Sequence, residues 1–209
     1  MEDVLEVYHR PYDRYRPLIC LDETTKQLVG EVREPLPMSP GQPASYDSHY
    51  LRNGVATLFM MVAPLDGWRE VRVTGGKTRM DYAHILQWLA EEKYKQAEKI
   101  VLVQDNLNTH HPCSLYEAFA PEKARALLER FEFHYTPRHG SWLNMAEIEL
   151  SVLQRQCLDC RIGEAGDLVA ATSAWSADRN QNLRKINWRM TTQDARIKLS
   201  KLYPSYHLA

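Results

Sequence analysis

Acidic side chains directly follow two short apolar segments of the sequence. Asp22 comes after residues 18–21, and Asp105 comes just after the β-branched run at residues 100–103. In open α/β sheets, ligands collect at the carboxyl ends of strands. Carboxylates gathered there repel one another unless a cation lies between them. The pattern is typical of a divalent-metal site for phosphoryl transfer, in which two ions contact the attacking and leaving oxygens.

A third acid is needed for such a site, and the sequence offers two. Glu147 and Glu149 lie near the start of a helix predicted for residues 142–157. At about 100° per residue, the two side chains flank the apolar stripe of that helix on opposite sides, so helix geometry does not choose between them. Acids also follow strands simply because they cap turns, and the pattern alone leaves that structural interpretation open.

The elements that would position these acids form an α/β pattern. A hairpin of strands followed by strands alternating with helices predicts one domain with a mixed sheet flanked by helices. Ser141 is the expected N-cap of the helix at residues 142–157. Residues 34–49, rich in proline, are expected to form a loop. Strands are predicted at residues 18–21, 55–63, 70–74, 100–103 and 131–135, and helices at residues 78–97, 114–130 and 142–157, with a helical tail over residues 164–203 broken near residues 187–188.

Composition excludes several classes of protein. The chain has 209 residues and a formal net charge of -1, which excludes a cationic surface over the whole molecule. The longest apolar stretch, residues 55–65, is shorter than the roughly 20 residues that span a bilayer, and the first residues lack the apolar core of a signal peptide. Four cysteines do not make a disulfide framework in a chain of this length. We therefore expect a protein of a reducing cytoplasm with no membrane partner.

The C-terminal part of the chain is locally basic. Residues 179–201 contain seven Lys or Arg and one acid, Asp194. Such a stretch can follow the phosphates of a nucleic acid, or it can be an ordinary solvated helix face.

Three sequence motifs, taken in order, resemble those of the bacterial insertion-sequence transposases of the mariner superfamily. They are LDET at residues 21–24, VQDNLNTH at residues 103–110 and TPRHGSWLNMAE at residues 136–147. The resemblance extends from residue 17 to residue 204. It implies a DDE endonuclease domain with an RNase H-like fold: a mixed α/β sheet flanked by helices.

The resemblance also implies a catalytic triad. By position in the motifs, Asp22, Asp105 and Glu147 would be the catalytic, metal-binding acids. Glu147 is selected over Glu149 because the Glu of this family stands three residues after the Asn of a Leu-Asn pair. Asn106 and His110 would shape the site. The implied cofactors are two Mg²⁺ (or Mn²⁺) ions, and the implied reaction is DNA strand cleavage followed by strand transfer at transposon ends.

The implied partner is DNA, both the transposon ends and the target. The side chains expected to contact DNA are Arg138, His139, Arg184, Lys185, Arg189, Arg196 and Lys198. We expect a homodimer assembled on DNA, in the bacterial cytoplasm with the nucleoid. Only 21 residues precede Asp22, so residues 1–209 are expected to form a single catalytic domain with a helical tail and no helix-turn-helix module. A separate DNA-binding module is then an expected partner.

Other interpretations are weaker. A catalytically idle transposase remnant, acting as a DNA-binding or interaction domain, is the alternative function, but three intact acids favour the enzyme. Cys157 and Cys160 form a single C-x-x-C pair, whereas structural zinc needs four ligands. The sequence GGKT at residues 75–78 lacks the earlier glycine of a phosphate-binding loop.

Overall fold

A five-stranded mixed sheet forms the centre of the molecule. The computed structural model describes residues 1–203, so residue 204, where the motif resemblance ends, lies outside the described part. The strand order is β3-β2-β1-β4-β5, in which β1, β2 and β3 are antiparallel neighbours and β4 and β5 run parallel to β1. The strands are β1 (Leu18–Glu31), β2 (Tyr50–Ala63), β3 (Trp68–Thr74), β4 (Ile100–Gln104) and β5 (Phe131–Tyr135).

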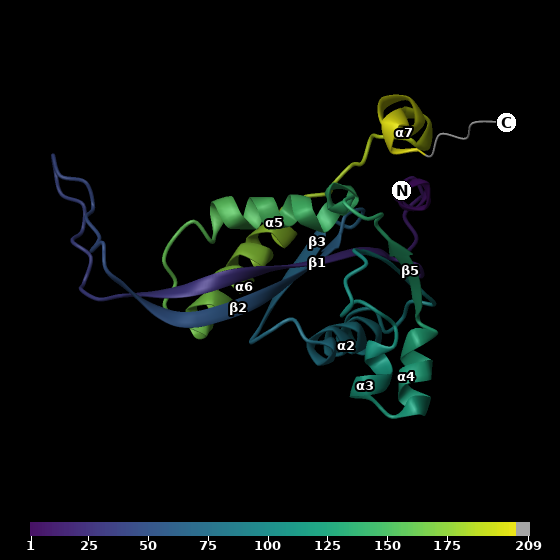
Figure 1. The fold of residues 1–209 in the computed structure, drawn as a ribbon, viewed down its shortest axis with the longest axis horizontal. Helices are drawn as coiled ribbons and strands as arrows, with labels where there is room; N and C mark the ends of the chain where they lie inside the picture. The colour runs from purple at the N-terminus through teal and green to yellow at the C-terminus, as the bar shows by residue number, and fades with distance from the viewer. Residues whose placement is uncertain (204–209) are drawn as a thin grey trace.

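Helices cover both faces of this sheet. Figure 1 shows α5 and α6 on one side and α2, α3 and α4 on the other, so the expected α/β fold class is confirmed. No helix in residues 1–203 combines the length and apolar character needed to cross a membrane. The helices are α1 (Glu2–Tyr8), α2 (Arg79–Trp88) with a π-helical continuation (Leu89–Lys93), α3 (Ser114–Ala118), α4 (Pro121–Leu128), α5 (Met145–Gln156), α6 (Ala165–Gln181) and α7 (Thr192–Lys198).

Strand alternation divides the buried side chains into two cores, because successive side chains of a strand point to opposite faces. Cys20 of β1 and Val103 of β4 belong to the core beneath α1, α5 and α6. Leu21 and Leu102 belong to the core beneath α2, α3 and α4. Asp22 has the same parity as Cys20, so β1 directs it to the α5 side of the sheet.

The strand that carries Asp22 is longer than predicted. We expected it to end at residue 21, but β1 continues to Glu31 in antiparallel pairing with β2. Its parallel pairing with β4 stops at Cys20↔Val103. The sequence does not predict this continuation, because residues 22–27 are mostly polar. Their backbone hydrogen bonds are made with β2, which lies more than 20 residues away in the sequence.

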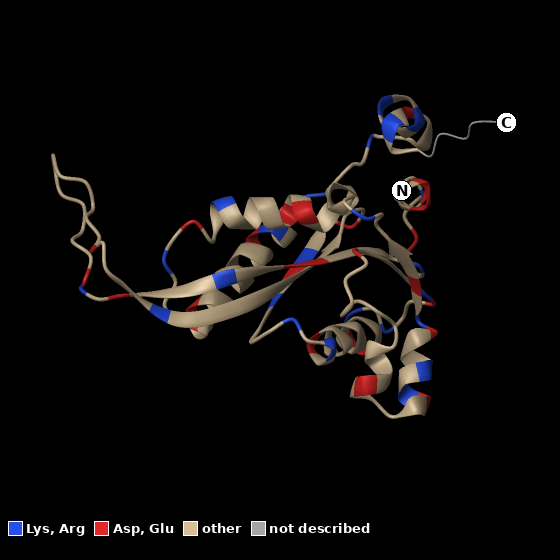
Figure 2. Cartoon of the chain, viewed as in Figure 1, with Lys and Arg blue, Asp and Glu red and all other residues tan. Residues whose placement is uncertain are grey.

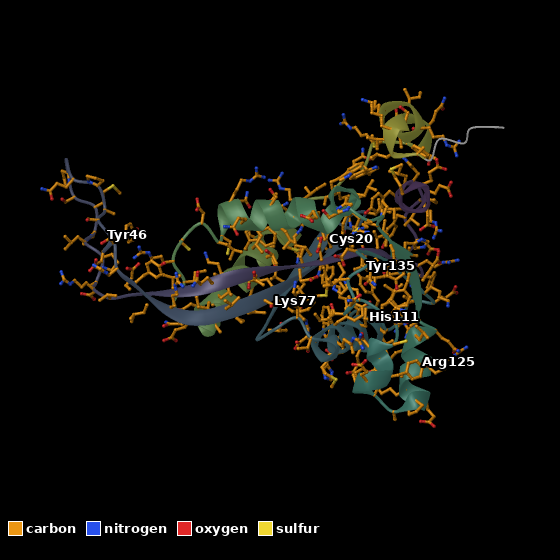
Figure 3. All side chains as sticks on the ribbon, in the orientation of Figure 1. Cys20, Tyr46, Lys77, His111, Arg125 and Tyr135 are labelled. Carbon is orange, nitrogen blue, oxygen red and sulfur yellow. The ribbon has the colours of Figure 1, made fainter. Side chains whose placement is uncertain are left out.

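The proline-rich segment at residues 34–49 is the tip of the long β1–β2 hairpin. It is almost entirely exposed, and its only pairings within the described chain are the isolated bridges Leu36↔Ser45 and Ser39↔Gln42. The hairpin extends far from the helices in Figure 1, and Figure 3 labels Tyr46 within this segment. The expected loop is therefore confirmed.

Three predicted helix boundaries are wrong. The helix predicted for residues 114–130 is two helices, α3 and α4, because Pro121 begins a new helix at its N-terminal position. The helix predicted for residues 78–97 ends at Lys93. The helix predicted from residue 142 begins at Met145, and a 3₁₀ turn, Ser141–Leu143, precedes it. The break in the tail is confirmed, since residues 182–191 separate α6 from α7.

Candidate active site

Strand register places Asp22 and Asp105 at the same level of the sheet. The last paired residues of β1 and β4 are Cys20 and Val103, and each aspartate stands two residues beyond its own member of that pair. Parallel neighbours lie about 4.8 Å apart across a sheet. β1 loses β4 as a neighbour at this point, and the sheet opens where the two carboxylates stand.

The start of α5 is attached directly to the strand of Asp22. Asn144, fully buried, caps this helix: its Oδ1 accepts a hydrogen bond from the backbone N–H of Ala146 at 3.1 Å. Its Nδ2 donates to the carbonyl of Leu21 at 2.8 Å and lies 3.3 Å from Asp22 Oδ2. The first turn of α5, which carries Glu147, is therefore held beside Asp22.

Asn144 is a site residue that sequence reasoning missed. We expected Ser141 to cap the helix, but Ser141 lies in the preceding 3₁₀ turn. The available signal was chemical, because Asn is among the preferred N-cap residues and stands three positions before Glu147.

Asp22 is buried, and the charges of the other two acids affect its pKa. Its side chain is only 7% exposed. Burial raises the pKa of the Asp22 carboxyl to about 7, and the carboxylates of Glu147 and Asp105 act in the same direction. A hydrogen bond from the backbone N–H of Glu23 to Asp22 Oδ1, at 2.8 Å, opposes the shift. Asp22, Asp105 and Glu147 therefore lie near the same edge of the sheet, close enough for the other two charges to act on Asp22.

His110 joins Asp105 to a fourth carboxylate. The ring of this buried residue places Nδ1 2.5 Å from Asp105 Oδ1 and Nε2 3.1 Å from Glu23 Oε2. Burial alone would lower the pKa of His110, but the contacts with Asp105 and Glu23 raise it to about 9. Burial likewise opposes ionisation of Asp105, yet the hydrogen bond from His110 lowers the pKa of Asp105 below its ordinary value. The contacts with Asp105 and Glu23 therefore favour the protonated ring of His110, and the hydrogen bond from His110 favours the charged form of Asp105.

A buried network holds His110 from the opposite side. The hydroxyl of Tyr82 donates to Gln104 Oε1 at 2.8 Å, and Gln104 Nε2 donates to the carbonyl of His110 at 2.8 Å. The rings of Tyr82 and His110 also lie 4.9 Å apart between centroids. The other expected site-shaping residue, Asn106, is exposed at the rim.

Glu149 lies in a separate, buried ion cluster. Its carboxylate is 3.1 Å from Arg69 Nε and accepts two hydrogen bonds from Arg179, at 2.7 and 3.0 Å. Arg69 is fully buried, and Glu149 is 2% exposed. In contrast, Glu147 makes no hydrogen bond or ion pair through its side chain within residues 1–203. The geometry therefore separates the two glutamates that helix periodicity left equivalent.

The chemistry of the donor set fits a hard divalent cation. Asp22, Asp105 and Glu147 offer only carboxylate oxygens, which Mg²⁺ and Mn²⁺ accept. Burial is the main cause of the raised pKa of Asp22, and the nearby carboxylates add to it; a bound cation would oppose both effects. No three His, Cys, Asp or Glu side chains in residues 1–203 stand close enough to hold an ion as they are arranged.

Two surface hollows meet beside these acids. One, of about 370 Å³, is lined by Asp105 and by the exposed side chains of Arg138 and His139. The other, of about 390 Å³, is lined by Glu147, Trp142 and Arg155. Ser141 lines both hollows. A chain of phosphates crossing Ser141 would pass both acids.

The basic residues of the tail have two different environments. Arg184, Lys185 and Arg189 lie in the segment between α6 and α7, are exposed and make no ion pair within the described residues. Arg196 instead pairs with Glu2 at 2.7 Å, and Lys198 Nζ lies 3.6 Å from Asp194. Figure 2 shows this basic helix, α7, next to the acidic N-terminal helix. Fewer cations of the basic stretch are therefore available to contact DNA than the count of Lys and Arg indicates.

The C-x-x-C pair lies far along α5 from the acids. Lys26 Nζ donates to the carbonyls of Leu158 at 2.6 Å and Cys160 at 2.8 Å, and so holds the turn between the two cysteines. Cys157 and Cys160 are both free thiols.

Comparisons with known proteins identify the same kind of domain. A family model described as DDE superfamily endonuclease matches residues 17–169, which contain all three acids. A search of curated proteins finds no match.

Solved structures of Mos1 transposase have a similar fold. A paired-end complex with the left transposon end gives a TM-score of 0.55 at 16% identity, covering 88% of this chain and 57% of that one. A Mos1 mariner paired-end complex with Mn gives 0.55 at 17% identity, covering 87% and 54%. A Mos1 strand transfer complex gives 0.54 at 16% identity, covering 87% and 55%. The chain spans a little over half the length of these transposases, and its mixed sheet is similar to their RNase H-like catalytic domain.

Proposed function

Because the chain belongs to the DDE superfamily endonucleases, we propose that it is a transposase catalytic domain that cleaves DNA strands and joins them at transposon ends. One observation supports the proposal: Asp22 and Asp105 stand at the same level of the sheet, and Asn144 holds the first turn of α5, which carries Glu147, beside Asp22. Such crowding of carboxylates is costly to a fold and is typical of a functional site.

The three acids would hold two Mg²⁺ or Mn²⁺ ions. When bound, such ions stabilise the negative charge on the attacking and leaving oxygens of a phosphodiester. The chain itself contributes orientation. His110 keeps Asp105 ionised and fixed, and Asn144 keeps the first turn of α5 beside Asp22.

The DNA would cross the two hollows that meet at Ser141. Arg138 and His139 stand at the rim next to Asp105, where a cation can contact a backbone phosphate. Arg184, Lys185 and Arg189 would extend the contact, and the paired residues Arg196 and Lys198 would contribute less. Assembly as a homodimer on DNA, a separate module that reads the transposon ends, and a location with the bacterial nucleoid are parts of this proposal.

Nicking of supercoiled plasmid DNA tests the proposal. We expect nicking by the chain in Mn²⁺ or Mg²⁺ and none in a chelator. Asp105→Asn and Glu147→Gln should each reduce the nicking rate by at least about 100-fold. Each substitution removes a carboxylate that would hold a metal ion, and the ion stabilises the negative charge of the transition state. Glu129→Gln, which alters an exposed ion pair on α4, is the matched control and should nick like the wild type. Full metal-dependent nicking by Asp105→Asn would contradict the proposal.

The idle remnant remains the competing function. It predicts a folded chain that binds DNA but does not nick it in any divalent metal, and whose thermal stability does not respond to Mn²⁺. An increase in melting temperature with Mn²⁺ that is lost in Asp22→Ala favours the enzyme.

A further inference from the structure

Within residues 1–203, Trp142 is the only tryptophan whose ring has neither an aromatic nor a cation–π partner. Trp68 and Trp88 stack on each other with ring centroids 6.2 Å apart. Trp175 lies under the guanidinium of Arg179, and the Trp188 ring contacts Tyr8. Within residues 1–203, the Trp142 indole makes no aromatic, cation–π or hydrogen-bond contact, and 43% of the residue is exposed.

The backbone that carries this exposed ring is firmly held. Leu143 and Asn144, which follow it, are fully buried. The hydroxyl of Tyr8 donates to the carbonyl of Leu143 at 2.7 Å, and Asn144 is bonded to β1. An exposed aromatic ring on a fixed backbone loses little conformational entropy when a flat ligand stacks on it.

The hollow beside Trp142 has the chemistry of a site for a single nucleotide. Ile148, 41% exposed, adds apolar surface next to the indole. Arg155 supplies a cation that makes no ion pair within the described chain, and Ser141 and Ser151 supply hydroxyls. Aromatic rings beside a cationic groove are how proteins bind single-stranded nucleic acid, because every base has a flat face. Glu147 lines the same hollow.

We propose that Trp142 stacks on an unpaired nucleobase adjacent to the phosphate handled at Glu147, with Arg155 contacting the neighbouring backbone phosphate. The proposal rests on the proposed function for the identity of its ligand, a DNA strand. A base inside a duplex already stacks on both faces, so the strand must be frayed, overhanging or flipped at this point. The site then favours DNA whose bases are open next to the cut.

Binding and cross-linking of single-stranded DNA test this inference without any cleavage. The probe is a short oligonucleotide containing 5-iodouracil, mixed with the Asp105→Asn chain. Ultraviolet cross-linking followed by peptide mass spectrometry should place the adduct on Trp142. By fluorescence anisotropy, Trp142→Ala should weaken binding by about 5- to 100-fold, the range for loss of one base–aromatic stack, and Trp142→Phe should bind nearly as the wild type does.

Tyr116→Ala is the matched control, because Tyr116 is 44% exposed but lies on α3, on the other side of the sheet. It should leave both measurements unchanged, and thermal melting should show all three variants folded. Equal affinity of wild type and Trp142→Ala, or adducts only at other residues, would overturn the inference. So would loss of self-association rather than DNA affinity in Trp142→Ala, which would assign the hollow to a second copy of the chain. If the chain does not nick DNA but the oligonucleotide still cross-links to Trp142, the result would contradict the proposed function and leave the stacking inference standing.

Discussion

Two aspartates at the same level of the sheet have opposite electrostatic environments. Burial and nearby carboxylates raise the pKa of Asp22 to about 7, whereas His110 lowers the pKa of Asp105. Near neutral pH Asp105 is therefore charged while Asp22 exchanges a proton. If a divalent ion binds between them as proposed, it would displace that proton, and metal binding would then be coupled to proton release.

Asp22→Asn should stabilise the metal-free protein at high pH. The carboxyl has an ordinary pKa of 3.8 and a folded pKa of about 7, so between these values the folded state binds more protons than the unfolded state. Stability is then lost as pH rises from about 4 to 7, and the loss persists above pH 7. The neutral amide avoids that loss, so its advantage should be about 1–4 kcal/mol at pH 8 and near zero at pH 4. Urea unfolding in a chelator measures both; equal destabilisation at both pH values would contradict the assignment.

The sequence motifs predicted three acids but not what surrounds them. Asp22, Asp105 and Glu147 stand in local patterns that can be read directly. His110 was expected near the site, but its contact with Glu23 joins residues 87 positions apart. The burial of Asn144 against β1 is equally long-range. Contacts of this kind depend on strand pairing, which no local pattern specifies.

At the scale of elements, one buried ion cluster fixes the helix that carries Glu147. Arg69 at the start of β3 and Arg179 at the end of α6 both bind Glu149 of α5. Arg69 also donates to the carbonyls of Gly67 and Arg184. Because Glu149 stands two residues after Glu147, this cluster sets the rotation of α5 about its axis and keeps Glu147 on the other side of the helix from Arg69.

Glu149→Gln and Glu147→Gln should therefore have opposite consequences. Glu149→Gln leaves Arg69 charged and buried without its counterion, which should cost about 3–5 kcal/mol of unfolding free energy. Glu147→Gln should leave stability nearly unchanged or raised while abolishing nicking. Denaturant unfolding measures the first effect, with Glu129→Gln as an exposed-pair control that should cost less than about 1 kcal/mol. Similar stability losses in the two variants would contradict the separation of roles.

Helix periodicity could not have separated these glutamates, since both flank the same apolar stripe. What separates them is Arg69, whose burial follows from the antiparallel pairing of β3 with β2. The extension of β1 was hidden for a related reason: its polar residues are stabilised by pairing with β2 rather than by a local apolar pattern. Strands and helices with a buried apolar face were predicted well. The end of β1 was not, because it depends on pairing with a strand that is distant in the sequence.

At the scale of the whole molecule, the basic segment between α6 and α7 is held at the turn between β2 and β3 and again at the end of α1, where Trp188 contacts Tyr8 and His9 contacts the carbonyl of Met190. The backbone N–H of Ile186 donates to the carbonyl of Pro64 at 3.0 Å, and Arg69 binds the carbonyl of Arg184. Gly67 has a φ of +74°, and a Cβ there would come within 2.7 Å of the Leu183 backbone. The turn between β2 and β3 therefore positions Arg184 and Lys185, and the end of α1 positions Arg189. A net charge of -1 conceals this local basic surface.

Cations that make no ion pair should contribute more to DNA affinity than cations that are already paired with an acid. Lys185→Ala and Arg189→Ala should each lower duplex affinity and reduce the slope of log K against log salt by about 1, as expected when one phosphate contact is lost. Arg125→Ala is the control, because Arg125 lies on α4 and pairs with Glu129; it should change neither quantity. Titrations at several salt concentrations measure both. A slope that is the same in all variants would show that the DNA lies elsewhere.

Mn²⁺ binding, followed by electron paramagnetic resonance of the free ion, tests most directly whether the three acids form one metal site. At pH 8 we expect saturable binding by the wild-type chain and binding weakened at least about tenfold in Asp22→Asn, Asp105→Asn and Glu147→Gln. Glu129→Gln should bind as the wild type does. Unchanged Mn²⁺ binding in a chain carrying all three substitutions would contradict the account.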